Sequence, residues 1–309
     1  MVKQSDTGFE KDMKQLTHCG YVAIIGRPNV GKSTLLNCIL GHKISITADK
    51  PQTTRYNILG IKTHTSYQTI YVDTPGLQQK EHRLLNRYMN KAVLGVLADG
   101  DVIIFVVEGT VWKDDDELVL RKITKLNRPI ILAINKVDKV IKKTDLLLFI
   151  EKLTAKHTFA EIIPITATTG HNVLELEQVI DKFLPEGPFL FPEEQITDRS
   201  DRFLASEIIR EKLTRNLGEE LPYAISVVIE QFKSEAKLLH IIATIIVEKP
   251  GQKAIVIGKD GAVLKKIGTM ARKDMEREFG HKVFLQLWVK IKSNWADDER
   301  ALKSFGLVA

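Results

Sequence analysis

A glycine-bracketed loop near the start of the chain carries residues suited to binding phosphate. Gly26 and Gly31 bracket it, and Lys32 and Ser33 complete the pattern G-x-x-x-x-G-K-[ST] between two apolar stretches. Backbone N–H groups of such a loop can wrap a phosphate chain, with Lys32 as the positive charge and the Ser33 hydroxyl as a Mg²⁺ ligand. The N-terminus of the following helix adds a partial positive charge. The pattern predicts a nucleoside triphosphate site formed by Gly26, Arg27, Pro28, Asn29, Val30, Gly31, Lys32 and Ser33.

A second motif, much later in the chain, bears on the choice of base. Asn135, Lys136, Val137 and Asp138 follow the apolar run 129–134, so a buried strand would present them at its carboxyl end. The Asp138 carboxylate can accept hydrogen bonds from guanine N1–H and the 2-amino group, whereas adenine lacks these donors. Asn135 can tether neighbouring loops, and the Lys136 stem can lie over the base. An isolated N-K-x-D also fits a helix cap after a strand, but its position downstream of a phosphate loop favours GTP and GDP as ligands.

A third group of residues is suited to contact the metal and the γ-phosphate. An alternating strand ends at Asp73, which would lie beside the Mg²⁺ shell, and the Gly76 N–H would lie near the γ-phosphate. Thr53 or Thr54 would complete the shell with Ser33. Hydrolysis would release both segments, which predicts an order–disorder switch. The contacts expected here are Asp73, Thr74, Pro75, Gly76 and Leu77. A later strand end at Ile165, Thr166 and Ala167 would offer N–H groups to the base, although it also fits an ordinary turn.

The motifs G-R-P-N-V-G-K-S, Q-T-T-R, D-T-P-G, N-K-V-D and I-T-A, in this order, resemble those of the translation-factor-related GTPases and, more narrowly, of the Era family. The resemblance implies that Thr54 is the switch threonine and that Asp73 acts on Mg²⁺ through a water. Leu77 stands where Ras-like GTPases carry the glutamine that orients water, so hydrolysis is slow, uses another group or needs a partner. Members of the wider group can hold K⁺ with the asparagine at position Asn29, and an ordinary loop residue is the equal alternative. The implied catalytic residues are Asn29, Lys32, Thr54, Asp73 and Gly76.

Length and composition predict more than one domain. The 309 residues exceed what one ordinary core fills, and a hydrophobic content of 44% is ample for folded domains. Alternating strand and helix patterns from Tyr21 to Leu184 predict an α/β domain with a mostly parallel sheet flanked by helices. A stretch with three prolines and a glycine follows. We therefore expect a nucleotide-binding domain at 1–185, a linker at 186–200 and a second domain at 201–309.

The first residues and the cysteines bear on the compartment. The charged segment Met1–His18 differs from a signal peptide, and no apolar run approaches the ~20 residues of a membrane helix. Cys19 and Cys38 have no metal-binding spacing, which favours packing roles in a cytosolic protein. We expect a cytoplasmic protein, and a peripheral contact with the inner face of the cell membrane stays open because a basic surface attracts anionic lipid.

A second glycine loop lies in the C-terminal part of the chain. Gly258 and Gly261 fit the pattern V-I-G-x-x-G-x-x-[IL]-x-x-I of KH domains, whose loop lies against a sugar–phosphate backbone. Asp260 makes this loop less cationic than others of its kind. Bases would rest on an apolar groove lined by Ile255, Ile257, Val263 and Leu264. The expected RNA contacts are Lys253, Ile257, Gly258, Lys259, Asp260, Gly261, Lys265 and Lys266.

The elements around this loop favour an α+β type II KH domain over an ordinary strand–helix turn. We expect the order α-β-β-α-β, with a helix at 204–217, strands at 224–231 and 238–247, a helix at 262–278 and a strand at 283–291. Between Lys249 and Lys292, eleven Lys and Arg residues face four acids, a net charge of +7 against +6 for the whole chain. The excess positive charge is therefore local, which favours RNA binding.

Both domains and the tail Asn294–Arg300 resemble the Era family across essentially the whole chain. The resemblance implies a monomeric GTPase that binds single-stranded rRNA at the 3′ end of 16S rRNA and assists assembly of the 30S subunit. Two alternatives stay open: a membrane-associated cell-cycle GTPase, and an RNA-binding scaffold with incidental GTP turnover. We also hypothesise that GTP with Mg²⁺ orders the segments Lys43–Tyr56 and Pro75–Tyr88 and thereby changes the packing between the domains.

Overall fold

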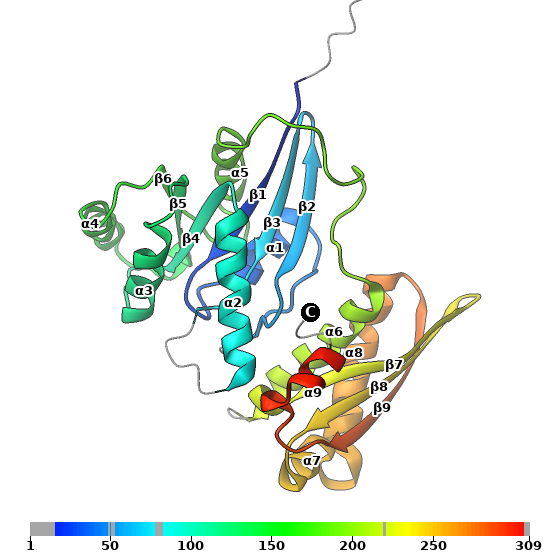
Figure 1. Cartoon of the computed structure of the whole chain (residues 1–309). Coiled ribbons are helices and arrows are strands. Elements are labelled where there is room, and N and C mark those ends of the chain that lie inside the picture. Colours follow the sequence, from blue (N-terminus) through cyan, green and yellow to red (C-terminus); the bar gives the residue numbers. More distant parts are fainter. Residues whose placement is uncertain (1–15, 49, 51–52, 78–82, 219–220, 306–309) are drawn as a thin grey trace, which may run out of the picture.

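The computed structural model describes residues 16–48, 50, 53–77, 83–218 and 221–305. Residues 49, 51–52 and 78–82, which belong to the two expected switch segments, lie outside this description. The described chain contains two sheets, each with its own core (Figure 1). No helix within these ranges combines the length and the apolar character needed to cross a bilayer.

A six-stranded sheet forms the centre of the N-terminal domain, in the order β2-β3-β1-β4-β5-β6. Its strands are β1 (His18–Ile25), β2 (Ile58–His64), β3 (Tyr67–Asp73), β4 (Val102–Glu108), β5 (Ile130–Asn135) and β6 (Glu161–Pro164). Neighbouring strands run parallel, except that β2 pairs antiparallel with β3. Every residue of β5 is buried, because helices cover both faces of the sheet, and the strand is therefore a continuous apolar run in the sequence. The mostly parallel sheet expected from the sequence is confirmed.

Within the described residues, five helices cover the two faces of this sheet. They are α1 (Lys32–Leu40), α2 (Leu84–Asp99), α3 (Asp114–Ile123), α4 (Lys143–Thr154) and α5 (Val173–Asp181). On one face, Leu36 of α1 and Leu176 of α5 share a core with Ile24. On the other, Leu97 of α2 packs in a core with Ile25 and with residues of α3 and α4. Ile24 and Ile25 enter different cores because successive side chains of a strand point to opposite faces.

The C-terminal domain consists of a three-stranded sheet with helices on one face. β7 (Ser226–Glu235) pairs antiparallel with β8 (Leu238–Val247), which pairs parallel with β9 (Lys282–Ile291). Helices α6 (Asp201–Asn216), α7 (Pro250–Ile257) and α8 (Ala262–Phe279) pack their apolar residues against this sheet in one core. The remaining short helices are η1 (Val137–Lys139) in the first domain, and η2 (Leu221–Ala224), η3 (Lys259–Gly261), η4 (Trp295–Asp297) and α9 (Glu299–Ser304) in the second.

Helix α7 corrects the expected order of elements. The order α-β-β-α-β lacked a helix between the second strand and the glycine loop, whereas the longer helices and strands from α6 to β9 follow the order α-β-β-α-α-β. Pro250 stands in the first turn of α7, where its missing N–H costs no helical hydrogen bond, and the Gln252 side chain accepts the Lys249 N–H. Periodicity alone cannot distinguish a helix from a strand in the short apolar run 254–257. The glycine loop therefore joins two helices.

The segment 186–200 lies along the first sheet on its way to α6. Gln68 Oε1 accepts hydrogen bonds from the N–H groups of Leu190 (2.8 Å) and Phe191 (3.0 Å), and Thr197 Oγ1 donates to a carbonyl of β2 at 2.7 Å. Figure 1 shows this segment passing beside β2 before it reaches the second domain. It is therefore docked on the N-terminal domain at several points.

Candidate nucleotide site and RNA-binding loop

The phosphate-binding pattern forms the turn between β1 and α1. Gly31 has a left-handed conformation (φ 101°), and a Cβ there would lie 2.3 Å from Asn135 Nδ2, so a larger residue does not fit. The Lys32 ammonium is buried and donates to two carbonyl groups of the loop at 3.0 Å each. Burial lowers the pKa of Lys32 to about 8, against the raising effect of Asp73. This buried cation at a helix N-terminus is suited to contact phosphate.

Three hydroxyl groups converge on one buried carboxylate beside the loop. Asp73 Oδ2 accepts hydrogen bonds from Ser33 Oγ (2.6 Å), Ser45 Oγ (2.8 Å) and Thr54 Oγ1 (3.4 Å). Asp73 Oδ1 is buried and has no hydrogen-bond partner among the described residues. Burial raises the pKa of Asp73, while Lys32 and the hydroxyl groups act to lower it. A carboxylate with an unpartnered oxygen beside hydroxyl ligands fits Mg²⁺, a cation that prefers oxygen donors.

Asn135 ties three loops together at the carboxyl end of β5. Its Nδ2 donates to Val30 O at 2.8 Å, and its Oδ1 accepts the N–H groups of Lys136 (2.8 Å) and Ala167 (3.0 Å). The tethering expected of Asn135 is therefore present. Asp138 lies on η1 with an exposed side chain and lines the same cavity as the phosphate loop. Its carboxylate is thus exposed and accessible to a ligand in that cavity.

The strand end after β6 forms hydrogen bonds within the protein. The N–H groups of Ile165, Thr166 and Ala167 donate to acceptors within the protein at 2.7, 3.1 and 3.0 Å. Each of these three N–H groups therefore has a partner within the protein, and their contact with the base stays a prediction. The next residue, Thr168, lines the cavity. A position one residue beyond a motif carries no signal of its own in the sequence.

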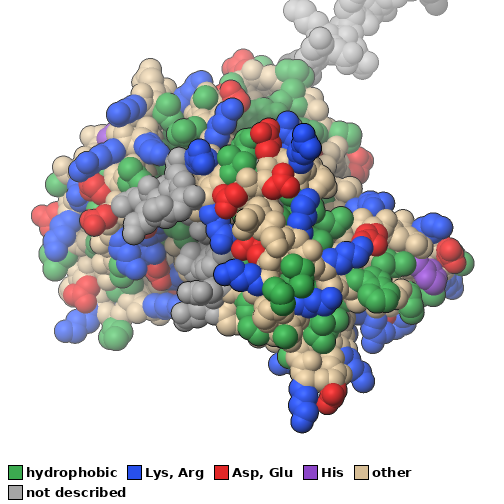
Figure 2. Space-filling model, turned by 60° about the horizontal axis from the view of Figure 1, so that its bottom comes forward, with side chains coloured by type: hydrophobic (Ala, Val, Ile, Leu, Met, Phe, Trp, Pro, Cys, Tyr) green, Lys and Arg blue, Asp and Glu red, His purple; other side chains and the backbone are tan. Residues whose placement is uncertain are grey.

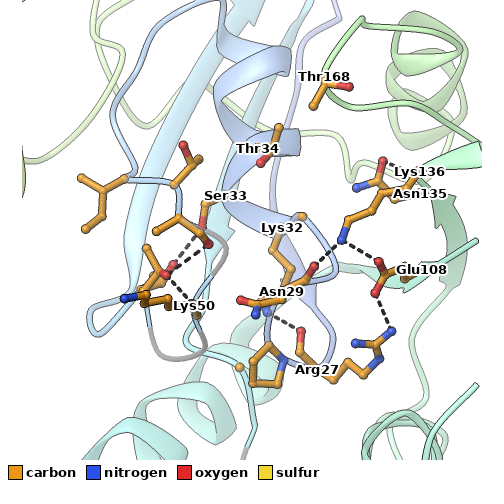
Figure 3. A pocket seen from close by; sticks show the side chains of 18 of the residues that line it. Arg27, Asn29, Lys32, Ser33, Thr34, Lys50, Glu108, Asn135, Lys136 and Thr168 are labelled. Carbon is orange, nitrogen blue, oxygen red and sulfur yellow. Dashed lines mark hydrogen bonds and ion pairs between the residues drawn. The ribbon is translucent and has the colours of Figure 1, made fainter. Parts of the chain in front are cut away.

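A network of ion pairs joins the phosphate loop to the guanine motif. Arg27 pairs with Glu108 (2.8 Å) and with the buried Asp116 (3.0 Å). Lys136 Nζ contacts the other oxygen of Glu108 (2.7 Å) and donates to Asn29 O (2.7 Å). Burial acts to raise the pKa of Glu108, but the hydrogen bonds from Lys136 and Arg27 hold that pKa below its ordinary value. Figure 3 shows Glu108 between the two cations. The sequence motifs did not include Glu108 or Asp116.

Asn29 and Leu77 occupy contrasting places. Asn29 has a left-handed backbone (φ 67°) and lines the cavity, so both expectations for it, a K⁺ ligand and a loop residue that tolerates this backbone, remain predictions. Leu77 is only 1% exposed and packs in the core with Val93 and Ile25. The position of the Ras glutamine is therefore used here for packing, and its side chain contacts no solvent.

A cavity of about 1130 Å³ lies over the phosphate loop (Figure 3). The expected site residues that line it are Arg27, Pro28, Asn29, Gly31, Lys32, Ser33, Thr54, Gly76, Asn135, Lys136 and Asp138. The others are outside its lining: Gly26, Val30, Asp73, Thr74, Pro75, Leu77, Val137, Ile165, Thr166 and Ala167. The C-terminal domain contributes Arg215, whose guanidinium donates to Thr47 O at 2.7 Å. The cavity is thus bounded by both domains, which no motif indicated.

The glycine loop of the C-terminal domain joins α7 to α8. Gly258 has a positive φ (73°), and a Cβ there would lie 2.4 Å from Val263 Cγ2, so glycine is required for this turn. The lysines at its rim, Lys259, Lys265 and Lys266, are exposed, and Lys253 is half-buried. Three of the four expected groove residues are partly buried against the core, while Ile255 is 51% exposed. The loop therefore presents lysines beside an apolar surface.

The expected first switch segment contacts the C-terminal domain. Lys43 forms an ion pair with Glu211 of α6 at 2.5 Å. Arg55, adjacent to the threonine at the Asp73 cluster, is 4% exposed and donates to Ile225 O at 2.7 Å. Its guanidinium lies over the Trp295 ring, 5.8 Å from the centroid. The residue next to Thr54 is therefore inserted between elements of the other domain.

The expected second switch segment contacts the same part of the C-terminal domain. The Leu84 N–H at the start of α2 donates to Asp297 Oδ1 at 2.9 Å. Leu85 and Met89 of α2 pack with the fully buried Trp295 in one apolar cluster. Figure 1 shows α2 extending from the first sheet toward α9. Trp295 is thus contacted from both of the expected switch segments.

Comparison with known proteins identifies the family. Two family models match, a 50S ribosome-binding GTPase over residues 21–136 and a KH domain over residues 220–296. GTPase Era of Haemophilus influenzae is 59% identical over 94% of this chain and 96% of its own length. This chain belongs to the Era family. As an Era-family GTPase, it is an enzyme that converts GTP to GDP and phosphate.

Two solved structures agree with this assignment over both domains. A single-residue variant of Aquifex aeolicus Era bound to GDP·AlF4⁻ matches with a TM-score of 0.91 at 41% identity, over 95% of this chain and 100% of that chain. Era in complex with MgGDPNP and nucleotides 1506–1542 of 16S ribosomal RNA matches with a TM-score of 0.91 at 42% identity, with the same coverage. The expected fold, a P-loop GTPase domain followed by a type II KH domain, is confirmed, as are GTP and GDP as ligands.

Proposed function

We propose that this Era-family chain is a GTP-controlled switch that binds the 3′ end of 16S rRNA and assists assembly of the 30S subunit. The observation that carries the proposal is the match over both domains to an Era crystallised with MgGDPNP and 16S rRNA nucleotides. In this proposal the chain consists of a nucleotide-binding domain at 1–185, a linker at 186–200 and an RNA-binding domain at 201–309. One copy of the chain is the active unit.

In the nucleotide site, each role follows from a contact. The negative charge of the β- and γ-phosphates would offset the cost of burying the Lys32 ammonium. The Asp138 carboxylate would accept the two guanine donors. Mg²⁺, held by Ser33, Thr54 and Asp73, would neutralise charge on the phosphate oxygens. The Thr54 hydroxyl lies 2.8 Å from that of Ser33, so both are already close enough to share one cation.

Hydrolysis in this site requires a water that position 77 cannot orient, since Leu77 is in the core. The Gly76 N–H would donate to the γ-phosphate, and K⁺ held by Asn29 would supply the missing positive charge. GTP turnover in potassium and in sodium buffer tests this role. We expect faster turnover in potassium, and loss of that stimulation in Asn29→Ala. Equal turnover in both buffers, with an unaffected variant, would remove Asn29 from the mechanism.

Coupling between nucleotide and RNA would run through Arg55 and Trp295. Movement of Thr54 on loss of the γ-phosphate would displace Arg55, because the two are adjacent in the chain. Arg55 is held by Ile225 O and Trp295, so this displacement would change the packing between the domains. We expect RNA affinity to differ between the GDP and GDPNP forms, and the difference to shrink in Arg55→Ala. Equal affinities in the wild type would refute the coupling, since a ligand without differential affinity shifts no equilibrium.

The proposed RNA function is tested by crosslinking the GDPNP-loaded protein to cellular RNA and sequencing what is recovered. The matched variant is Gly258→Asp/Gly261→Asp, which places side chains and negative charge in the loop. Reads clustered at the 3′ end of 16S rRNA, and lost in the variant, are the expected result. Diffuse reads that survive the substitution would indicate nonspecific phosphate binding and would contradict the proposal.

A second candidate is a peripheral contact with anionic membrane lipid, favoured by the surface around α4. Ile141 is 97% exposed, and Leu147 and Leu148 are 66% and 55% exposed. Lys142 and Lys143 are exposed beside them. Apolar side chains flanked by lysines suit the surface of an anionic bilayer. Flotation with anionic vesicles tests this contact, and Leu147→Gln/Leu148→Gln should abolish it. Equal flotation of the variant would reject this surface.

A further inference from the structure

The outer face of the C-terminal sheet, opposite its helices, is covered at one end and open at the other. At the covered end, Ile246 packs with Leu85 and Met89 of α2 and with Trp295. Beyond Ile246 the sheet continues without such a cover among the described residues. The open face, as we name this part, carries Lys233, His240 and Phe284 opposite one another in one row, Gln231 and Gln286 in the next row, and Trp288 beyond it.

The alternation of the strands assigns these residues to the outer face. Val283 and Val289 of β9 are buried in the core shared with the helices. Residues of one strand at even spacing from them belong to the same face, and those between belong to the other. Phe284 and Trp288 therefore point away from the helices, and they are 51% and 53% exposed. Large aromatic side chains exposed together on one strand indicate a binding surface.

Charged and polar groups surround the two rings. Lys282 and Lys290 lie on the same face of β9, with side chains 80% and 62% exposed. The His240 ring is tilted against Phe284, with centroids 5.5 Å apart. Three acids lie beside these groups: Glu230 pairs with Lys290 at 2.9 Å, Glu235 lies 3.6 Å from His240, and Glu276 of α8 lies 4.0 Å from Lys282. Figure 2 shows hydrophobic side chains among Lys and Arg at the surface of this domain.

We propose that the open face is a second surface for single-stranded RNA, on which Phe284 and Trp288 each stack one base. The proposal extends the RNA-binding function proposed above and rests on it. Sheets with exposed aromatic rings stack bases in this way, and flanking lysines contact the phosphates. Phe284 and Trp288 are four residues apart on one strand, roughly 13 Å. Bases stacked on each other are roughly 3.4 Å apart, so the two rings take bases from an extended strand.

Charge complementarity favours RNA over a protein partner on this surface. Lysine is depleted at the centre of protein–protein interfaces, whereas the open face has Lys233 in the same row as Phe284, and Lys282 and Lys290 at its edge. The Gln286 amide lies on the strand between the two rings, where it can donate to and accept from a base edge. The groups present are those that a single strand requires: rings for bases, amides for their edges and ammonium groups for phosphates.

The test compares RNAs of two lengths, because a KH loop clamps about four nucleotides. The full chain with GDPNP is titrated with an RNA of about 5 nucleotides and with one of about 15 nucleotides, both from the 3′ end of 16S rRNA. We expect Phe284→Ala and Trp288→Ala each to weaken binding of the longer RNA about tenfold and to leave the shorter one unchanged. Phe183→Ala, at a 38% exposed phenylalanine of the other domain, is the matched control.

Two further measurements keep the outcome decisive. Trp288→Tyr retains an aromatic ring and should restore affinity for the longer RNA, which a folding defect would not allow. Quenching of tryptophan fluorescence by the longer RNA should be smaller in that variant than in the wild type. Unchanged affinity of both alanine variants for the longer RNA would overturn the proposal. Altered sedimentation with unchanged RNA affinity would instead assign the open face to a second copy of the chain.

Failure of this proposal is distinguishable from failure of the proposed function. Gly258→Asp/Gly261→Asp should lose the shorter RNA, whose binding depends on the glycine loop alone. If that variant keeps the shorter RNA, the proposed role of the loop is wrong. The open face is judged separately, by whether Phe284→Ala and Trp288→Ala lower affinity for the longer RNA.

Discussion

Glu108 holds the phosphate loop and the guanine motif in one geometry, and Glu108→Gln should weaken nucleotide binding without changing the chemical step. The carboxylate accepts from Arg27 at 2.8 Å and from Lys136 at 2.7 Å. Glutamine has nearly the same shape but no charge, and its amide nitrogen repels one of the two cations. The buried Asp116 keeps a second contact with Arg27, so the loop should remain folded.

The magnitude follows from the two hydrogen bonds. A hydrogen bond to a charged group contributes about 1.5–3 kcal/mol, against about 0.5–1.5 kcal/mol between neutral groups, so two bonds lose about 2 kcal/mol. The Glu108 side chain is 27% exposed, and solvent screening reduces this loss. We therefore expect about 1 kcal/mol, which raises the Kd about fivefold.

Stopped-flow release of fluorescent GDP and GDPNP measures this effect. Both should dissociate about fivefold faster from Glu108→Gln, because the network positions parts of the site common to both nucleotides. The kcat at saturating GTP should stay the same. Glu117→Gln is the matched control, since Glu117 also pairs with a lysine (Lys156, 2.9 Å) but does not line the cavity. Unchanged release rates, or a lower kcat with unchanged release, would refute the positioning role.

Three further outcomes are expected. Asp138→Asn should lower GTP affinity and raise affinity for xanthine nucleotides, because asparagine can donate to the xanthine 2-oxo group; competition binding measures this, and unchanged GTP affinity would contradict the assignment. GDP affinity should fall about tenfold from pH 7 to 9. The Lys32 pKa is about 8 in the free protein and the bound phosphate raises it, so binding takes up a proton. A GDP affinity that calorimetry finds unchanged between these pH values would exclude this. Trp295→Ala removes a fully buried ring and should lower the free energy of unfolding by about 3–5 kcal/mol, as measured by urea denaturation; a loss below about 1 kcal/mol would mean that the cluster around Trp295 contributes little.

Sequence motifs were sufficient to predict those parts of the site whose residues are neighbours in the chain or lie at strand ends. The phosphate loop was predictable because Gly31, Lys32 and Ser33 must be adjacent to form a turn before a helix. The tether made by Asn135 was predictable because a parallel strand brings its carboxyl end to the same edge as β1. Helix α7 was missed since the run 254–257 is too short to show a period of 3.6 residues. The hydrogen bonds that Ile165 and Ala167 make within the protein could not be predicted from the motif, because their acceptors, Ile134 O and Asn135 Oδ1, belong to another strand, β5.

The sequence by itself determined the two domain types and the ligand class, since these depend on residues within one turn or one strand end. Only the tertiary structure decided which residues far apart in the chain contact one another around the site and between the two domains. Asp116 and Glu108 meet Arg27, Arg55 meets Trp295, and Arg215 reaches the nucleotide cavity, although none of these pairs is close in the chain. Such contacts depend on how two cores pack against each other, and the apolar periodicity of a sequence records burial without recording the partner.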